Sequence, residues 1–350
     1  MHPLYAAMPT TVFERYSARA RETGAINLGQ GFSDSSGPPD VVEAAARALT
    51  EGSNQYPPSR GLPELREAVA AHYVRHQGLP LTPDHVTVTS GATEALAAAI
   101  FALVSPGDEV VLFQPLYDAY LPLVQRAGGV ARLVRLAPPD WRITAEALDA
   151  AFSPRTRLVI LNTPLNPGAT IITDEELALL ADRVLASDAV IVSDEVWEHV
   201  LFDGARHRSP MHLPRLRDRT VKIGSAGKIF SLTGWKVGWM CAAPDLAVPL
   251  ARAHPFLTFT TPPNLQAAAA FGLGKDDSYF ERMRSDFARS RDRLTDALRA
   301  GGWTVLPSSA TYFLSLDLAA SGIPVDDVTF CDRLVNEFGV AAIQIGRAHV

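Results

Sequence analysis

The sequence predicts an α/β fold, with a large domain built on a mostly parallel, helix-covered sheet and a smaller α+β domain. Three observations support this prediction. Short β-branched segments alternate with helical segments between Val86 and Ala242, which is typical of a parallel sheet covered on both faces. After Pro262 the pattern changes to long helical segments with few strands. A chain of 350 residues, 47% of them apolar, is also long enough for two domains.

The N-terminal part precedes the alternating pattern, and we expect residues 1–34 to form an arm. Pro39 marks the start of a helix, because proline is favoured at the first helical position. The elements expected here are a helix at 12–23, an extended stretch at 26–32, a turn-rich stretch at 33–39, a helix through 41–49, a polar loop at 52–61 and a helix at 63–76.

The alternating part predicts seven strands, at 86–89, 109–113, 130–136, 158–161, 189–193, 220–224 and 237–242. Helices are expected between most of them, at 94–104, 117–127 and 174–186, and then beyond the sheet at 264–272 and 279–300, before two strands at 303–305 and 312–316. We place the large domain at 46–272 and the small domain at 35–45 and 273–344. The small domain should share its core with the N-terminal segment.

Composition excludes several classes of protein. A net charge of −6 without a basic run makes a nucleic-acid partner unfavourable. Two cysteines cannot form a disulfide framework, which fits a reducing compartment. The opening residues lack the features of a secretion signal, and the longest apolar run, Ala95 to Val104, is too short to span a bilayer. We expect a soluble, cytoplasmic protein.

The segment from Ile223 to Trp239 is the strongest candidate for chemistry. It places Lys228 among small residues that leave room for a flat ring, with a second lysine, Lys236, eight positions on. A lysine shielded from water loses basicity, so its amine can act as a nucleophile. Apolar neighbours such as Phe230 favour burial, whereas the alternative is a surface loop that carries two lysines.

Three other site types fit the sequence less well. The string Ser225-Ala226-Gly227-Lys228 matches S-x-x-K, but neither of the accompanying S-D-N and K-T-G strings occurs. The string Gly29-Gln30-Gly31 begins a dinucleotide fingerprint, but Asp34 stands at the third glycine position. The nine histidines show no metal-ligand spacing, so we expect no metal site.

Four other groups lie at the ends of predicted strands, where ligands of an open α/β sheet bind. Backbone N–H groups at Gly91 and Ala92 begin a helix and suit a phosphate, although such a string is also an ordinary helix cap. Asp194 is placed to pair with a cationic ring nitrogen, or is an acidic N-cap. Asn166 lies in a Pro-bearing turn, and Tyr117 either stacks on a ring or belongs to the core. Together with Lys228, this set suits pyridoxal phosphate.

These motifs resemble the fold-type I pyridoxal-phosphate aminotransferases, and most closely their kynurenine/glutamine/methionine branch. The resemblance covers the chain from about Val12 to Ala342. The matching strings, in order, are Leu28-Gly29-Gln30-Gly31-Phe32, Asn54-Gln55-Tyr56, Asn162-Thr163-Pro164-Leu165-Asn166-Pro167, Ser193-Asp194-Glu195-Val196, Ser225-Ala226-Gly227-Lys228 and Thr233-Gly234-Trp235-Lys236-Val237-Gly238.

The resemblance implies a role for each matching residue. Lys228 holds the cofactor as an internal aldimine and later moves the proton, and Asp194 keeps the pyridine nitrogen protonated. Asn166 binds the phenolic oxygen, Tyr117 stacks on the ring, and the backbone of Gly31 approaches the substrate carboxylate. The phosphate is bound by Gly91, Ala92, Ser225 and Lys236, with Tyr56 reaching over from a second subunit.

The sequence departs from this family in three places. Trp197 stands where the family usually has tyrosine; an indole N–H still donates to the phenolic oxygen of the cofactor. Gly168-Ala169-Thr170 replaces a Thr/Leu-Gly-Lys turn. The family's C-terminal arginine, which grips the substrate carboxylate, is absent, and Arg347 lacks its aromatic context. Because residues 345–350 resemble a translated sequencing adaptor, we expect a non-native tail and a longer natural protein.

The implied activity is that of a transaminase (EC 2.6.1.-). It moves an amino group from an L-amino acid to a 2-oxo acid by a ping-pong aldimine mechanism, in a homodimer with shared active sites. The alternatives are a cysteine-conjugate β-lyase of the same fold and a non-catalytic aminotransferase-like ligand-binding domain. Apolar candidates for the substrate pocket favour aromatic or sulfur-containing side chains; they are Phe13, Tyr16, Phe256 and Phe259.

Overall fold

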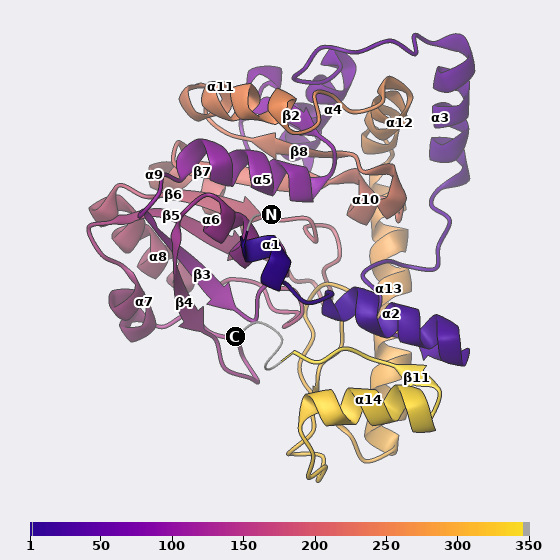
Figure 1. The fold of residues 1–350 in the computed structure, drawn as a ribbon. Coiled ribbons are helices and arrows are strands. Elements are labelled where there is room, and N and C mark those ends of the chain that lie inside the picture. Colours follow the sequence, from indigo (N-terminus) through magenta and orange to yellow (C-terminus); the bar gives the residue numbers. More distant parts are fainter. Residues whose placement is uncertain (2, 346–350) are drawn as a thin grey trace.

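The computed structural model describes residue 1 and residues 3–345, in which seven strands form the central sheet (Figure 1). Their order is β2-β8-β7-β6-β5-β3-β4. Every neighbouring pair is parallel except the two pairs that involve β8, so the predicted mostly parallel sheet is confirmed. The strands are β2 (Val86–Thr89), β3 (Glu109–Gln114), β4 (Val130–Arg135), β5 (Thr156–Asn162), β6 (Val190–Asp194), β7 (Thr220–Ser225) and β8 (Gly238–Cys241).

Helices cover both faces of this sheet because successive side chains of each buried strand point to opposite sides. In β3, Leu112 packs in one core cluster and Val111 in another. The first cluster includes side chains of α5 (Ala92–Leu103), α6 (Tyr120–Arg126) and α11 (Pro244–Ala253). The second includes side chains of α7 (Ala145–Ala151), α8 (Asp174–Ser187) and α9 (Pro214–Arg217).

A third cluster closes the end of the sheet where β2 and β8 lie. It includes Val88 and Trp239 from these strands and residues of the surrounding helices. Those helices are α3 (Pro39–Glu51), α4 (Pro63–Gln77), α10 (Ala226–Ile229) and α12 (Pro263–Leu273). Figure 1 shows α3 and α12 beside each other at this end of the molecule.

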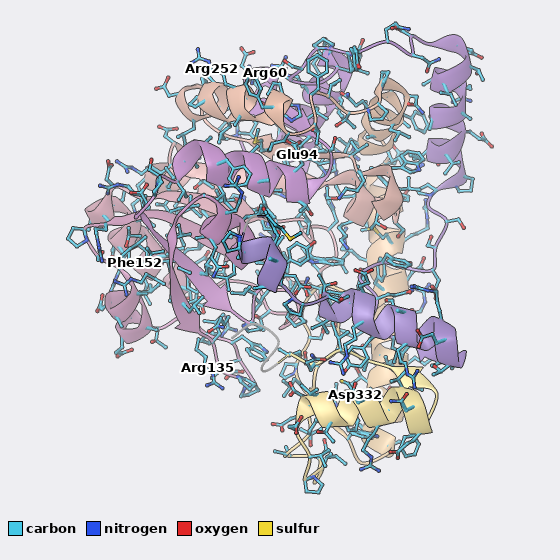
Figure 2. All side chains as sticks on the ribbon, viewed as in Figure 1. Arg60, Glu94, Arg135, Phe152, Arg252 and Asp332 are labelled. Carbon is cyan, nitrogen blue, oxygen red and sulfur yellow. The ribbon has the colours of Figure 1, made fainter. Side chains whose placement is uncertain are left out.

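The smaller part joins the two ends of the chain. Helix α2 (Val12–Thr23) packs against α14 (Asp327–Glu337), and β1 (Ile26–Asn27) pairs in parallel with β11 (Val340–Ala341). Tyr16 is buried here and its hydroxyl donates to Asp332, which lies on the side of α14 that faces α2 (Figure 2). The predicted sharing of a core between the small domain and the N-terminal segment is confirmed. Helix α1 (Pro3–Ala7) lies beside α6. The long helix α13 (Asp277–Ala300) runs from the large part of the molecule toward α14 (Figure 1).

The strand predicted at 312–316 is wrong. The observed pair is β9 (Thr304–Val305) with β10 (Leu316–Asp317), which are antiparallel. Residues before β10 leave the pair because their backbone binds the large part: Ser309 N–H and Ala310 N–H both donate to the carbonyl of Ala169, and Thr311 N–H donates to the carbonyl of Val200.

A buried ion network lies behind the ends of β6 and β7. The amine of Lys222, on β7, contacts a carboxylate oxygen of Glu195 and lies 2.7 Å from one of Glu198, and all three side chains are fully buried. Tyr73 donates to Glu198, and Ser209 donates to Glu195. Burial alone lowers the pKa of Lys222, but the two carboxylates outweigh it and raise the pKa above its ordinary value. Because Glu195 directly follows Asp194 in the chain, the network adjoins the end of β6.

Across the described part of the chain, no helix combines the length and the apolar character needed to cross a membrane.

Candidate active site

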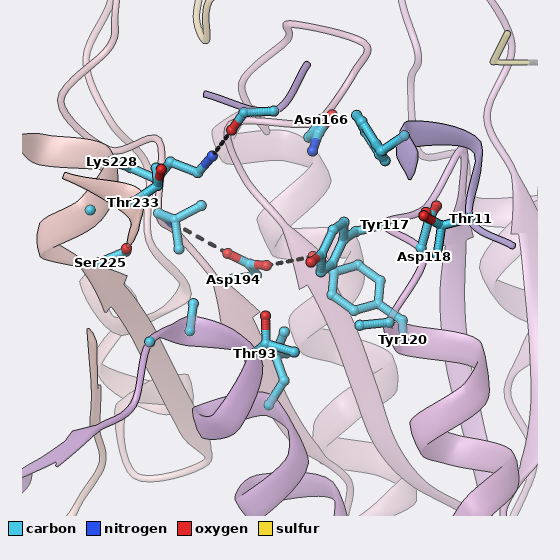
Figure 3. A pocket seen from close by; sticks show the side chains of 18 of the residues that line it. Thr11, Thr93, Tyr117, Asp118, Tyr120, Asn166, Asp194, Ser225, Lys228 and Thr233 are labelled. Atoms are coloured by element: carbon cyan, nitrogen blue, oxygen red, sulfur yellow. Dashed lines mark hydrogen bonds between the residues drawn. The ribbon is translucent and has the colours of Figure 1, made fainter. Parts of the chain in front are cut away.

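A cavity of about 730 Å³ lies at the carboxyl ends of β3, β5, β6 and β7 (Figure 3). Parallel strands end at the same edge, so residues that are distant in sequence converge there. The predicted site residues that line it are Phe13, Gly31, Gly91, Ala92, Tyr117, Asn166, Asp194, Trp197, Ser225, Lys228 and Lys236.

Lys228 extends into this cavity from α10, directly after β7. Its Nζ donates to the carbonyl of Gly31 at 2.5 Å and to the hydroxyl of Tyr312 at 3.4 Å, and it lies 4.6 Å from the centre of the Trp197 ring. Burial lowers the pKa of Lys228 to about 8, and Asp194 opposes this shift. The amine therefore deprotonates far more readily than an ordinary lysine.

Asp194 ends β6 and is 5% exposed. It pairs in register with Asn162 of β5, whose side-chain amide donates to the Asp194 carbonyl at 3.0 Å. Its carboxylate accepts a 2.6 Å hydrogen bond from the hydroxyl of Tyr120. Burial raises the pKa of Asp194, whereas the Tyr120 bond and the charge of Lys228 lower it. A cation placed against this carboxylate offsets the burial.

The start of α5 forms a cradle for an anion. Gly91 has a φ of +80°, which directs the first N–H groups of the helix toward the cavity, where the helix dipole is positive. A Cβ atom on Gly238 would lie 2.8 Å from the Ala92 nitrogen, so only glycine allows this approach. Lys236, itself in the left-handed region at φ 54°, brings its amine close to Gly91, and Ser225 lies at the end of β7.

The remaining predicted side chains line the same cavity as Asp194. Tyr117 meets Tyr120 edge to face at 5.6 Å, and its hydroxyl is hydrogen-bonded to Thr93. The backbone N–H of Asn166 donates to Asn162, while its side-chain amide points into the cavity (Figure 3). Trp197 is 2% exposed and contacts Tyr312 edge to face at 4.4 Å.

The sequence profile of aminotransferase class I and II matches residues 23–350. The chain belongs to this family. It is 42% identical over 337 residues to a probable N-succinyldiaminopimelate aminotransferase of Mycobacterium tuberculosis, covering 95% of this chain and 85% of that protein. A kynurenine–oxoglutarate transaminase of Dictyostelium discoideum is 33% identical over 369 residues, covering 95% and 85%. The solved Escherichia coli methionine aminotransferase YbdL aligns with a TM-score of 0.95 at 40% identity, covering 99% and 90%.

Class I and II aminotransferases use pyridoxal 5′-phosphate, and this cavity fits that cofactor. The cradle at Gly91 suits the phosphate, and the absence of a Cβ on Gly238 lets the backbone of Gly91 and Ala92 take this position. Asp194 faces the cavity as a buried carboxylate whose charge burial disfavours, which suits a protonated ring nitrogen. Lys228 supplies the amine that the aldehyde requires. An anion cradle, a buried carboxylate and an amine thus lie together in one cavity, which suits the phosphate, the ring nitrogen and the aldehyde of the cofactor.

Four predicted residues lie outside this cavity. The prediction that Tyr16 lines the substrate pocket is wrong, because its ring is buried between α2 and α14. Phe256 and Phe259 are exposed and do not line the cavity of their own chain, so that placement is wrong for the single subunit. Tyr56 is 81% exposed and meets Phe259 edge to face at 4.9 Å. Its reach into a second subunit stays a prediction.

Two residues of the site are not distinguished by the sequence. Tyr120 begins α6, and its hydrogen bond to Asp194 joins residues 74 positions apart. Tyr312 lies in a predicted strand, and no local pattern distinguishes it, because its contact with Lys228 spans 84 residues.

Replacing Lys228 by methionine should stabilise the cofactor-free protein. Its folded pKa of about 8 lies below the ordinary 10.5, so the buried charge costs stability below pH 8. This cost fades as the pH rises from 8 to 10.5, where only the unfolded chain keeps the proton. We expect Lys228→Met to raise the free energy of unfolding by on the order of 2 kcal/mol at pH 7 and by less at pH 10, as measured by urea titration.

Lys222→Met is the matched control for this prediction. It removes a buried ammonium that two carboxylates hold, so it should instead destabilise the protein by about 3–5 kcal/mol. A Lys228→Met protein less stable than wild type at pH 7 contradicts the prediction.

Tyr120→Phe should weaken cofactor binding, and more so at low pH. The Tyr120 hydroxyl lowers the pKa of Asp194, so without it burial raises that pKa further and Asp194 takes up a proton at a higher pH. Loss of one hydrogen bond to a charged group predicts about tenfold weaker binding of pyridoxal phosphate at neutral pH. Binding measured by absorbance between pH 5 and 9 checks this.

Tyr117→Phe should leave the pH midpoint unchanged, because its hydroxyl is bonded to Thr93. Equal midpoints in wild type and Tyr120→Phe would refute the coupling.

Proposed function

We propose that this aminotransferase takes an amino group from an L-amino acid with an aromatic or sulfur-containing side chain and passes it to a 2-oxo acid. The observation that carries the proposal is the placement of Lys228 and Asp194 in one cavity whose lining is mostly apolar. The similarity to a methionine aminotransferase and to a kynurenine transaminase supports the same substrate class.

We assign each residue of the cavity a role in this reaction. The bound cofactor supplies an electron sink for the bond broken at the amino acid Cα. Lys228 would hold the cofactor through its amine and would carry the proton to and from Cα. Asp194 would keep the ring nitrogen protonated, and Tyr120 would keep Asp194 ionised. Asn166 and Trp197 would bind the phenolic oxygen, Tyr117 would stack on the ring, and Gly91, Ala92, Ser225 and Lys236 would bind the phosphate.

The substrate side of the cavity favours an uncharged side chain. Phe13, Phe32 and Phe313 line it, and such a wall buries an apolar side chain favourably. Among the described residues that line the cavity, the cationic side chains are Lys228 and Lys236, and we assign both to the cofactor. Glu14 and Asp118 also line it and repel a second carboxylate. This wall suits methionine or phenylalanine better than a dicarboxylic amino acid.

A panel of amino acids tests this selectivity. Methionine and phenylalanine should discharge the absorbance of the bound aldehyde cofactor at least about tenfold more efficiently, in kcat/KM, than glutamate or aspartate, since an unpaired charge in this wall disfavours the transition state. Lys228→Met, loaded with the same cofactor, should show no discharge with any of them. Faster discharge by glutamate would contradict the proposed preference for uncharged side chains, but it would still show transaminase activity. Release of pyruvate and ammonia from a cysteine conjugate would instead reveal β-lyase activity.

We further propose a homodimer in which Tyr56 completes the phosphate site of the partner. Tyr56 and Phe259 form an exposed aromatic pair, and Phe256 is 90% exposed beside it in sequence. Exposed aromatic groups of this kind mark interaction surfaces. A two-fold dimer brings the same surface of each chain to the other chain's cavity.

Complementation between two defective variants tests this arrangement. Tyr56→Ala retains Lys228, and Lys228→Met retains Tyr56, so a mixed dimer holds one site with both residues. Refolding the two variants together should give more transaminase activity than either gives alone. Activity of the mixture equal to the sum of the separate preparations, with dimers seen by sedimentation, would place Tyr56 outside the partner's site.

A further inference from the structure

Three groups contact the amine of Lys228: a backbone carbonyl, a tyrosine hydroxyl and an indole ring. The carbonyl of Gly31 and the hydroxyl of Tyr312 accept from Nζ, at 2.5 Å and 3.4 Å, and the Trp197 ring lies under it at 4.6 Å. Tyr312 comes from the segment between β9 and β10, far in sequence from α10.

The backbone fixes where the Tyr312 ring lies. Ser309 and Ala310 bind the Ala169 carbonyl at 2.9 Å and 3.1 Å, and Thr311 N–H binds the Val200 carbonyl at 2.9 Å. Thr311 is fully buried and has a φ of +63°, a conformation that a threonine keeps only when its surroundings impose it. Three backbone hydrogen bonds directly before Tyr312 therefore anchor it to the large part of the molecule.

Side-chain packing then directs the hydroxyl at Lys228. The Tyr312 ring meets Trp197 edge to face at 4.4 Å and Phe313 at 4.8 Å, which restricts its rotation. Burial raises the pKa of Tyr312, so the phenol stays neutral and its oxygen accepts from an ammonium or donates to an amine. Trp197 has only an N–H donor and cannot accept.

We propose that Tyr312 is a positioning residue for Lys228: its ring packs edge to face against the indole of Trp197, and its hydroxyl holds the lysine amine at the place from which it reacts. The proposal rests on the proposed function only for what the amine does; the contact itself is a property of this chain. The hydroxyl adds the acceptor that the indole lacks, beside the backbone carbonyl of Gly31.

The lysine content of the chain makes a direct test possible. Lysine occurs at four positions only, namely 222, 228, 236 and 275. Cofactor-free protein made with ¹³Cε-lysine therefore gives four side-chain signals, and Lys228→Met identifies that of Lys228. Its chemical shift followed against pH gives the pKa of this one amine.

Tyr312→Phe removes only the hydroxyl, and it should lower the pKa of Lys228. An acceptor stabilises the protonated amine, so its loss favours the neutral form. At this distance we expect a fall of about half a unit, roughly threefold in the ionisation constant. The control is Tyr279→Phe, which removes a hydroxyl that donates at 3.4 Å to the carbonyl of Ile229, next to Lys228 in sequence, and does not contact the amine. It should leave the pKa of Lys228 unchanged.

An unchanged pKa of Lys228 in folded Tyr312→Phe overturns the proposal. The signal of buried Lys222 reports in the same spectra whether the fold is intact, and Tyr312→Met, which also lacks a hydroxyl, replaces the phenylalanine variant if that one does not fold. With pyridoxal phosphate bound, Tyr312→Phe should lower kcat with methionine more than it changes KM. Failure of the proposed function is distinguishable, because wild type would then not discharge the cofactor although the Lys228 pKa still shifts.

Discussion

Two lysines six residues apart are buried in this fold, and their opposite surroundings explain how the site is built. Lys222 lies between Glu195 and Glu198, which compensate its charge. Lys228 is buried with a carbonyl, a phenol and an indole, and its nearest carboxylate, Asp194, is itself disfavoured as an anion. The first arrangement stabilises the strands, and the second leaves an amine that gives up its proton easily. Reactivity here follows from a charge that the fold does not fully compensate.

The sequence sufficed for the features that are local. Alternating β-branched and helical segments located the seven strands of the central sheet, since most of these strands are buried on both faces and read as continuous apolar runs. Three local patterns likewise located residues that line the cavity: small residues beside a lysine for Lys228, an aspartate at a strand end for Asp194, and a glycine before a helix for Gly91. Each of these is decided by its neighbours in the chain.

The errors concern contacts between distant segments. Tyr16 resembles a pocket residue in sequence but its hydroxyl binds Asp332, 316 residues away, which turns the ring into the small core. Tyr312 resembles a strand residue, but the carbonyls of Ala169 and Val200 hold the backbone before it and take it out of the β9–β10 pair. Phe259 belongs to an exposed aromatic pair. No periodicity reports such pairings, because they depend on how separate elements pack.

The geometry also links cofactor binding to stability. Burial moves the pKa of Asp194 up and that of Lys228 down, so each group resists the charge that their mutual attraction favours. A cation against Asp194 would restore its ionisation, and a ligand bonded to Nζ would remove the need to bury an ammonium. The folded state alone offers both groups in one cavity, so a ligand that meets them binds the folded chain and not the unfolded one. The same uncompensated charges that cost stability thus become the source of the affinity of the site.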